Sequence, residues 1–548
     1  MKNNKLARSV AMALLGFAAH TLAQAADLQG GTPPQPKASD AEAVPQLKLE
    51  KSLVTQDKAG PSVTLHEVLI SGNKFVATSA LRAQVGSVES QSFDMAGLNA
   101  LADKLADYYH ASGYPFAQVY LPPQDLKGGV LKINVLEGTY GIIKGVGKDG
   151  LGEGAQPFLD YGLLHGDPIA NKQLERTMLI LDDQPGLKIR PVIKPGAAQG
   201  EADLTVNVRR ESYVSGDVGI DNTGPLSTGR NRLHAAADFN SPFRYGDKIS
   251  LNAMVTNEHM RLGSIDYETP LGVSGLRGKI GYAHTSYVLG GQFASLDAQG
   301  IANVTSAKLT YPLVRSQALN VFLSVGVEHK KLEDDYRAAG IVRSKSSNGI
   351  PVGLQFDKRD ALLGGGVTYG MLTWVHGKLN LDGAAATADV ATANTQGAYN
   401  KINLDVARIQ RVSGDFSAYG RFSGQWANKN LDSSEKFNLG GYYGVRAFPL
   451  GEGVGDRGWF AQLELRYAMG AVTPFVFYDY GKSDINAKPW DANSDATRKV
   501  GAAGVGARTL WDKWSLDATL GWRNQGGAST SENVDRNPRL FVMLGRRF

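Results

Sequence analysis

Cysteine and long apolar runs are both absent from this chain of 548 residues. A helix that crosses a membrane needs about 20 consecutive apolar residues, and no stretch of the sequence approaches that length. We therefore exclude a multi-span helical membrane protein. The lack of cysteine excludes a fold held together by disulfides and is compatible with a protein that passes through an oxidising periplasm.

The residue patterns of common catalytic and ligand sites are absent as well. Neither a Ser-His-Asp order, nor a phosphate-binding glycine loop, nor a dinucleotide fingerprint occurs in a strand-to-helix context. The histidines are scattered, without the spacing of metal ligands. The formal net charge of +5 includes Lys2, Lys5 and Arg8, so nothing indicates a nucleic-acid partner. We predict no catalytic residue, no metal site and no cofactor.

Glycine is abundant, with 65 residues, and apolar and polar residues alternate along much of the sequence after Ser212. In residues 459–467 the odd-numbered positions are all apolar, whereas glutamine, glutamate and arginine occupy even-numbered positions. Alternating stretches of about ten residues, separated by turn residues, are typical of transmembrane β-barrels. About sixteen such stretches fit into residues 212–548, which predicts an all-β transmembrane barrel of about 16 antiparallel strands. Helical periodicity does not recur after Ser212, so we expect no helix there.

The N-terminal 25 residues have the three parts of a secretory signal. A basic start is followed by an apolar segment at residues 10–19 and by the small-residue cleavage site Ala23-Gln24-Ala25. We expect residues 1–25 to be a signal peptide. Residues 26–61 contain prolines among glycine and polar residues, which indicates a linker.

Residues 62–138 have the pattern of a small α+β domain. Asp94 is expected to cap a helix that carries Leu98, Leu101 and Leu105 on one face and ends at Gly113. Strand-like stretches precede and follow this helix.

Residues 139–211 repeat the pattern less clearly. A helix with Leu174, Met178 and Leu181 on one face is followed by strands at residues 187–193 and 204–208. We therefore predict two α+β domains before the barrel.

The connection at about residues 429–457 is too long for a simple hairpin. Loops longer than ~12–15 residues are usually functional or disordered, and this one contains several aromatic residues with which it can pack. Later in the chain, Phe475, Phe477, Asp479 and Gly481 share one face of a strand. A carboxylate in a barrel interior needs a cation, so we predict that the loop folds into the lumen and that Arg446 contacts Asp479.

These segments resemble conserved motifs of two-partner secretion outer-membrane transporters (TpsB proteins) of the haemolysin secretion/activation family ShlB/FhaC/HecB. Gly444-Val445-Arg446-Ala447-Phe448 is similar to the V-R-G-Y/F loop motif, with alanine in place of the family's glycine. Phe477, Asp479 and Gly481 match the F-x-D-x-G strand motif. Tyr120-Leu121-Pro122-x-Gln124 and the L-x-I-x-V-x-E-G stretch of residues 131–138 resemble the POTRA domain of this family.

The resemblance implies a function and a location. Two POTRA domains in the periplasm would bind the N-terminal secretion domain of one large exoprotein, an adhesin or haemolysin, and the barrel in the bacterial outer membrane would export it unfolded. Tyr120, Leu121, Pro122 and Gln124 are candidate client-binding residues. The terminal Phe548 resembles the signal that the barrel-assembly machinery reads, and outer-membrane lipid would surround the barrel. A helix that plugs the pore occurs in some family members, but residues 26–61 show no amphipathic pattern for one.

Several alternatives stay open at this stage. A barrel-assembly insertase of the same superfamily or a passive porin would also have a membrane barrel. The Arg446–Asp479 pair can be a brace alone, and Tyr120, Leu121 and Pro122 can be ordinary core and turn residues.

Overall fold

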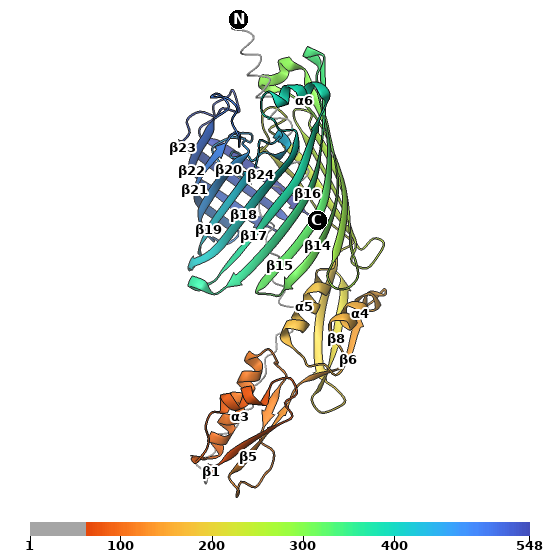
Figure 1. The fold of residues 1–548 in the computed structure, drawn as a ribbon, viewed down its shortest axis with the longest axis vertical. Helices are drawn as coiled ribbons and strands as arrows, with labels where there is room; N and C mark the ends of the chain where they lie inside the picture. Colours follow the sequence, from red (N-terminus) through yellow and green to blue (C-terminus); the bar gives the residue numbers. More distant parts are fainter. Residues whose placement is uncertain (1–61) are drawn as a thin grey trace. The chain divides into compact units, whose positions relative to one another are not determined.

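A computed structural model describes residues 62–548. They form two compact units, residues 62–211 with 272–274 and residues 212–271 with 275–548 (Figure 1). The expected signal peptide and linker lie outside the described residues. Among these residues, no helix combines the length and the apolar character that a membrane span requires.

The first unit begins with an α+β module. Its elements are β1 (Val63–Leu65), β2 (Glu67–Ser71), α2 (Thr78–Val85), β3 (Gln91–Phe93), α3 (Met95–Ala111), β4 (Gln118–Tyr120) and β5 (Val130–Leu136). Strand β5 is central in a sheet of order β2-β5-β4, parallel to β2 and antiparallel to β4. Strands β1 and β3 form a separate pair.

Helix α3 is the helix expected from the sequence. The Asp94 side chain accepts a hydrogen bond from the backbone N of Gly97 at 2.7 Å, which caps the first turn. The leucine face packs against the sheet, with Leu105 fully buried. Tyr109, on the same helix, donates from its hydroxyl to Glu137 at 2.7 Å. Glu137, which directly follows β5, therefore holds α3 in place.

The second module has the order β6 (Thr139–Val146), α4 (Leu151–Gly162), α5 (Asn171–Asp182), β7 (Leu187–Pro195) and β8 (Glu201–Arg210). Its sheet has the order β6-β8-β7. Helix α5 and its two following strands agree with the sequence prediction. Helix α4 was not expected, because its glycines and Pro157 have poor helix propensity.

Packing explains why α4 forms. Leu151, Ala155, Phe158 and Leu159 are buried against the sheet. A Cβ atom at Gly152 would lie 2.8 Å from the carbonyl oxygen of Gly145 on β6, so only glycine allows this close approach between helix and strand.

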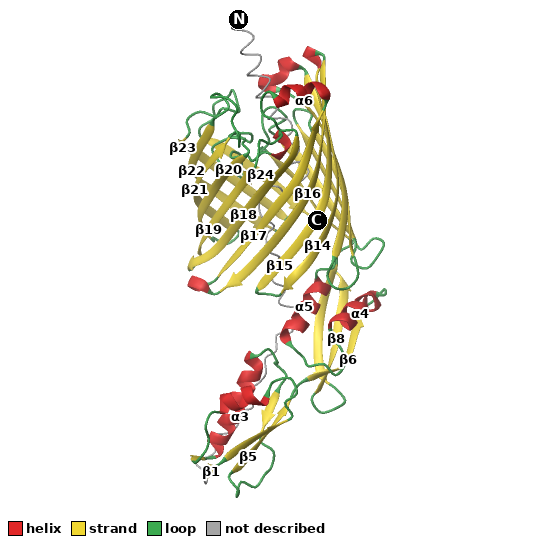
Figure 2. Cartoon of the chain, in the orientation of Figure 1, coloured by secondary structure: helices red, strands yellow, loops and turns green. Residues whose placement is uncertain are grey.

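The second unit is a closed barrel of sixteen antiparallel strands, which confirms the predicted fold class (Figure 2). Its strands are β9 (Val214–Asp221), β10 (Arg232–Asn240), β11 (Lys248–Thr256), β12 (Arg261–Pro270), β13 (Arg277–Val288), β14 (Ala298–Arg315), β15 (Leu319–Tyr336), β16 (Ile341–Asp360), β17 (Gly366–Leu381), β18 (Gly397–Ser413), β19 (Phe416–Ala427), β20 (Arg457–Tyr467), β21 (Val472–Asp484), β22 (Thr497–Trp511), β23 (Trp514–Gln525) and β24 (Arg539–Arg547). Residues 543–547 of β24 pair with residues 217–221 of β9 and close the barrel.

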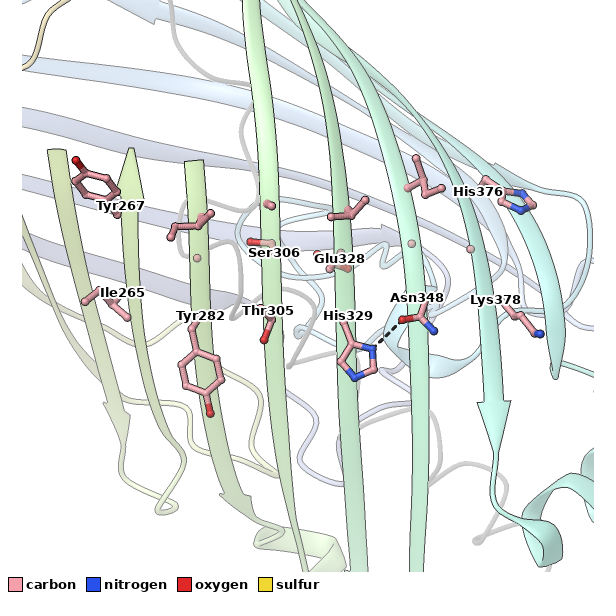
Figure 3. Close-up of a pocket in the computed structure, with 17 residues that line it drawn as sticks. Ile265, Tyr267, Tyr282, Thr305, Ser306, Glu328, His329, Asn348, His376 and Lys378 are labelled. Atoms are coloured by element: carbon pink, nitrogen blue, oxygen red, sulfur yellow. Dashed lines mark hydrogen bonds between the residues drawn. The ribbon is translucent and has the colours of Figure 1, made fainter. Parts of the chain in front are cut away.

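Alternation divides each strand between two environments. Leu463 and Val476 point outward and are 59 % and 52 % exposed, as expected for side chains that meet lipid, whereas Gln462 and Glu464 point inward and are buried. The outward side chains of β12 to β17 are among those drawn in Figure 3.

The two ends of the barrel differ. We call the end at which β9 begins the proximal end and the opposite end the distal end. Proximal connections are short, such as that between β22 and β23, whereas the distal connections include long loops. Paired rings mark both ends of the outward face, with Trp511 and Trp514 at the proximal end and Trp459 and Tyr480 toward the distal end.

The distal β17–β18 connection contains helix α6 (Gly383–Val390), so the expectation of no helix after Ser212 was wrong. The helix starts at Asp382, whose side chain accepts from the backbone N of Ala385 at 2.9 Å. None of its residues is buried, and its small side chains give it no apolar stripe, which explains why periodicity did not reveal it. Short 3₁₀ turns occur at η1 (Gly291–Leu296), η2 (Arg337–Ala339), η3 (Leu362–Gly364) and η4 (Ser433–Glu435).

Candidate functional site in the barrel lumen

The connection between β19 and β20, residues 428–456, folds back from the distal end into the barrel. We call it the lumenal loop. Leu439, Val445 and Phe448 of this loop are fully buried. They belong to one apolar cluster with residues of β20, β21 and β22, namely Phe460, Phe475, Phe477, Val500 and Ala502.

Arg446 lies at the buried tip of the lumenal loop and contacts Asp479 directly. The backbone N of Arg446 donates to Asp479 Oδ2 at 3.0 Å, Nε donates to the same oxygen at 2.8 Å, and Nη2 donates to Oδ1 at 2.7 Å. Arg446 is 2 % exposed and Asp479 is 0 % exposed. This bidentate geometry fixes both the position and the orientation of the loop tip.

Glu464 on β20 is a second carboxylate at the loop tip, which the sequence had not singled out. It accepts from Nη1 of Arg446, and it also binds Arg466 at 2.7 Å and Arg508 at 2.9 Å. Arg508 reaches on to Asp517 at 2.6 Å. The site is therefore a buried network of alternating charges rather than one isolated ion pair. The alternation along β20 could have indicated Glu464 as a lumenal carboxylate, because Glu464 shares the inward face of the strand with Gln462.

Two phenylalanine rings contact the guanidinium groups of Arg446 and Arg508. The guanidinium carbon of Arg446 lies 3.9 Å from the ring centre of Phe477, and that of Arg508 lies 4.2 Å from the ring centre of Phe475. Such contacts favour a cation over the ring face.

Glycines on the neighbouring strands leave the space that the loop tip and these rings fill. A Cβ atom at Gly521 would lie 2.5 Å from the carbonyl oxygen of Arg446, and one at Gly504 would lie 2.5 Å from the Phe477 ring. A Cβ atom at Gly481, the last residue of the strand motif, would lie 2.8 Å from Phe460. The F-x-D-x-G motif therefore combines a ring, a carboxylate and an open space on one face.

The backbone of the loop tip is tightly packed. A Cβ atom at Gly444 would lie 2.1 Å from the carbonyl oxygen of Leu439, which requires glycine there. Gln462 donates from Nε2 to the carbonyl oxygen of Gly444 at 2.8 Å. Ala447 is buried and does not have a positive φ, so a methyl group is accommodated where the family motif has glycine.

Three lysines that point into the lumen bind the first limb of the loop. Lys345 pairs with Asp432 at 2.8 Å, and Glu435 pairs with Lys330 at 2.8 Å and with Lys401 at 2.9 Å. These lysines come from β15, β16 and β18, so the loop is also attached to a part of the wall that lies three to six strands before β21.

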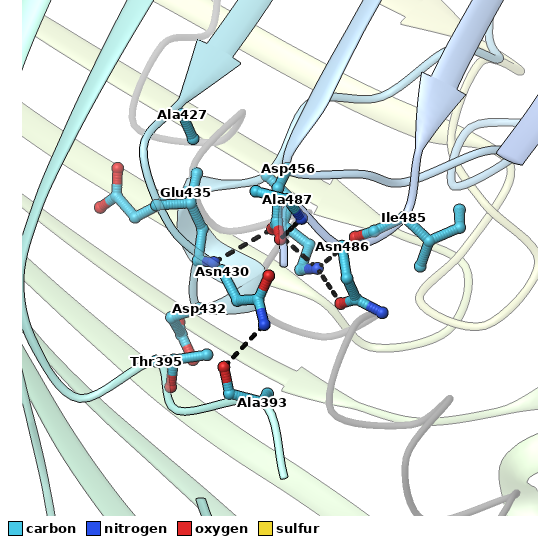
Figure 4. A network of polar contacts seen from close by, with 12 residues as sticks. Ala393, Thr395, Ala427, Asn430, Asp432, Glu435, Asp456, Ile485, Asn486 and Ala487 are labelled. Carbon is cyan, nitrogen blue, oxygen red and sulfur yellow. Dashed lines mark hydrogen bonds and ion pairs between the residues drawn. The ribbon is translucent and has the colours of Figure 1, made fainter. Parts of the chain in front are cut away.

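Polar contacts also connect the lumenal loop to other distal connections (Figure 4). Asn430 donates from Nδ2 to the carbonyl oxygens of Ala393 and Lys488, each at 2.8 Å. Asp456, which is fully buried, accepts from the backbone N of Ala487 at 2.8 Å. The loop thus joins the β17–β18 and β21–β22 connections.

Glu452 binds the loop to the β23–β24 connection. It is 0 % exposed and pairs with Arg498 at 2.7 Å. Its carboxylate also accepts hydrogen bonds from the hydroxyls of Ser529, Thr530 and Ser531, at 2.8 to 2.9 Å. Glu452, like the three lysines, was not found from the sequence.

The candidate client-binding residues lie at one edge of the first module. Tyr120 ends β4 and is 41 % exposed, whereas Leu121 packs against the core of the module. The Gln124 side chain is occupied, because it donates to the carbonyl oxygen of Lys132 and accepts from the backbone N of Lys132, both at 2.7 Å. Gln124 therefore closes the edge of β5 beyond the end of β4, and Pro122 lies in the turn between them.

Phe548 lies beside the strand that closes the barrel. Its backbone N donates to the carbonyl oxygen of Gly216 on β9 at 3.0 Å. A Cβ atom at Gly216 would lie 2.6 Å from the Phe548 ring, so the terminal ring packs where glycine leaves room.

Comparison with known proteins assigns the chain to a family. The model for the haemolysin secretion/activation protein family ShlB/FhaC/HecB matches residues 200–509, and the model for the ShlB-type POTRA domain matches residues 63–138. The chain belongs to this family. Members of the ShlB/FhaC/HecB family are outer-membrane transporters of two-partner secretion, and their POTRA domains are periplasmic. The proximal end of the barrel is therefore periplasmic and the distal end is extracellular.

Curated relatives in the ShlB/FhaC/HecB family include two named transporters. The chain is 27 % identical over 427 residues to the heme/hemopexin transporter protein HuxB of Haemophilus influenzae, which covers 76 % of this chain and 75 % of HuxB. It is 24 % identical over 481 residues to the outer membrane transporter CdiB of Dickeya dadantii, which covers 84 % of this chain and 83 % of that protein. The solved structure of CdiB from Escherichia coli has the same fold, with a TM-score of 0.73 and 21 % identity over 97 % of this chain and 98 % of that chain.

Proposed function

We propose that this protein recognises one large exoprotein of the adhesin or haemolysin type in the periplasm and exports it unfolded through the barrel. The relatives support this class of cargo, since HuxB is named a heme/hemopexin transporter and HpmB of Proteus mirabilis a hemolysin transporter. The N-terminal secretion domain of the exoprotein is the part that the POTRA domains bind.

The outer edge of β4 is the proposed docking place for an extended client strand. Added strands bind through main-chain hydrogen bonds, and nearby side chains provide selectivity. Tyr120 is exposed at this edge, and Leu121 and Pro122 follow it. Gln124 has a positioning role, because its two bonds to Lys132 keep the segment after β4 against β5.

The buried tip of the lumenal loop is the observation that carries the proposal for transport. A sixteen-stranded barrel is wide enough for an aqueous channel, and here the loop occupies part of that interior through Arg446, Asp479 and Glu464. An unfolded chain needs less width than a folded domain, but the loop must still shift to let it pass. Folding of the client outside the cell supplies the direction of transport.

Two further roles belong to the same proposal. The barrel-assembly machinery recognises the last strand with Phe548 during insertion, and the outward face of the barrel contacts outer-membrane lipid. Neither role involves a cofactor or an enzymatic reaction.

A secretion assay tests client recognition at β4. The open reading frames beside its gene are searched for a large, signal-bearing exoprotein. This exoprotein is expressed with the transporter, and its amount in the medium is measured. Tyr120→Asp should reduce secretion at least tenfold, because a charge at the edge opposes strand addition. Tyr161→Asp, at an exposed tyrosine of the second module (64 % exposed), is the matched control and should secrete normally. Equal secretion by both variants, with the barrel assembled, would contradict the proposal.

A further inference from the structure

A groove of about 920 Å³ runs across the outward face of β12 to β17 (Figure 3). Thr305 and Ala307 on β14 have small side chains. The paired positions on β13 carry Tyr282 and Ile280, which are larger. On the other side, His329 pairs with Thr305, and Val327 pairs with Ala307. The small residues of β14 thus form the floor between two raised rows.

The apolar part of this groove lies at membrane depth. Ile280 and Val327 are 60 % and 57 % exposed on the outward face, as in the rest of the lipid-facing belt. Trp374 on β17 is also outward and exposed, and rings of this kind lie at the membrane interface. His376, the next outward residue toward the extracellular end, is one step beyond Trp374, and the two rings lie 6.2 Å apart. The extracellular rim of the groove is therefore at the depth of the lipid headgroups.

Three histidine–asparagine pairs occupy this rim. In each pair the two residues are direct register partners on neighbouring strands, and the histidine Nδ1 lies within hydrogen-bond distance of the asparagine Oδ1. The pairs are His284 with Asn303 at 2.8 Å, His329 with Asn348 at 2.8 Å, and His376 with Asn400 at 3.1 Å.

Unpaired cations lie among these histidines. Lys331 follows His329 on the outward face of β15, and Lys378 follows His376 on β17 and is the register partner of Asn348. Both side chains are exposed, and within residues 62–548 neither forms an ion pair. Glu333, one outward step beyond Lys331, is the nearest outward carboxylate on that strand. The rim thus offers more positive than negative groups above an apolar groove.

We propose that this groove binds a phosphorylated glycolipid of the outer leaflet, of the lipid A type. An acyl chain lies in the groove over Thr305 and Ala307, and a phosphate at headgroup depth contacts Lys331 and Lys378, with the histidine–asparagine pairs as hydrogen-bonding neighbours. Lysines near an anionic lipid surface each add to its attraction, so the loss of both should weaken lipid binding at least tenfold.

Native mass spectrometry of the full chain in detergent, titrated with bisphosphorylated hexa-acyl lipid A, tests the assignment. The double variant Lys331→Ala/Lys378→Ala should bind the first lipid at least tenfold more weakly. The comparison variant is Lys482→Ala/Lys499→Ala, a register pair one step beyond Tyr480 on β21 and β22 in which Lys482 pairs with Asp484 at 3.3 Å, and it should change affinity less than twofold. Equal losses in both double variants would show charge attraction without a site and would overturn the proposal, as would no loss in the first.

Two further measurements distinguish binding of a lipid in the groove from binding of a phosphate group alone. Ala307→Phe fills the floor and should weaken lipid binding at least tenfold while both lysines remain. Inorganic phosphate should not compete at millimolar concentration, and lipid A without phosphates should bind wild-type protein at least tenfold more weakly. Effective competition by inorganic phosphate, or equal binding of the unphosphorylated lipid, would overturn the assignment. The heat-dependent shift of the barrel on a denaturing gel verifies that each variant is assembled, and the lysine variants decide the test if Ala307→Phe does not assemble.

Discussion

Asp479 accepts three hydrogen bonds from Arg446, one from the backbone and two from the guanidinium, although 33 residues separate them in the chain. Arg446 has a further partner in Glu464, and both carboxylates lie on strands that are direct neighbours. Arg446 therefore makes the ion pairs of the loop tip with both carboxylates of the wall, beside the Gln462 hydrogen bond and the apolar cluster. A single substitution can weaken these ion pairs without removing any part of the wall.

Asp479→Asn should free the loop tip and increase the open-pore conductance of the barrel. Removal of one partner of a buried ion pair costs about 3–5 kcal/mol, and much of that cost falls on the bound position of the loop. Conductance is measured in planar bilayers with purified protein. Asp484→Asn, at a half-exposed carboxylate on the same strand, serves as the control and should behave as wild type. An unchanged conductance in Asp479→Asn, with normal assembly, would show that the pair does not hold the loop in place.

Gly521→Ala should displace the same loop tip without altering any charge. The added Cβ would lie 2.5 Å from the carbonyl oxygen of Arg446, which is a backbone atom that cannot turn away. We expect conductance to rise as in Asp479→Asn and secretion of the partner exoprotein to change in parallel. Gly263→Ala is the matched control, because a Cβ there meets no atom within 4 Å. If the two alanine variants behave alike, the close approach of Gly521 to Arg446 does not determine the position of the loop tip.

The sequence was sufficient to predict the barrel, because strand periodicity is a local property that each segment carries on its own. It was also sufficient to pair Arg446 with Asp479, since both lie in motifs of unusual composition. Glu464, Glu452 and the three lumenal lysines could not be found in this way. Each lies on an ordinary alternating strand or loop, and its partner depends on how far the loop enters the lumen.

Helix α4 is an element that the local sequence did not predict. Its glycines and Pro157 argue against a helix locally, yet burial of Leu159 and the close approach at Gly152 favour one. Tertiary packing therefore determines that this segment is helical. That packing involves residues distant in the sequence, so a short stretch of sequence cannot predict it.

Glu452→Gln should loosen the β23–β24 connection while leaving the loop tip in place. The carboxylate accepts from Arg498 and from three hydroxyls, so its neutralisation leaves the part-buried guanidinium of Arg498 without its anionic partner. We expect faster hydrogen exchange in residues 526–538 and no change in peptides that contain Arg446. Glu258→Gln, an acidic residue of the β11–β12 connection, is the comparison variant. Exchange that rises equally at the loop tip would mean that the two attachments are not independent.

Tyr109→Phe should destabilise the first POTRA domain at neutral pH and lose this effect in alkali. Burial, and then the hydrogen bond to Glu137, raise the pKa of Tyr109 above its ordinary value of about 10. A raised pKa means that the folded state favours the neutral phenol, so the contribution is complete below pH ~10 and is lost as the pH rises beyond it. Below pH ~10 the lost bond to a carboxylate costs about 1.5–3 kcal/mol.

Because the chain has no cysteine, Ala102→Cys in α3 provides a single thiol whose labelling during urea titration reports unfolding of this domain. The difference in unfolding free energy between the protein with Tyr109 and the Tyr109→Phe variant, both carrying this thiol, should narrow as the pH rises from about 9 to about 11, across the ordinary pKa of tyrosine. A difference that stays constant over this range would show that the phenol does not titrate with unfolding.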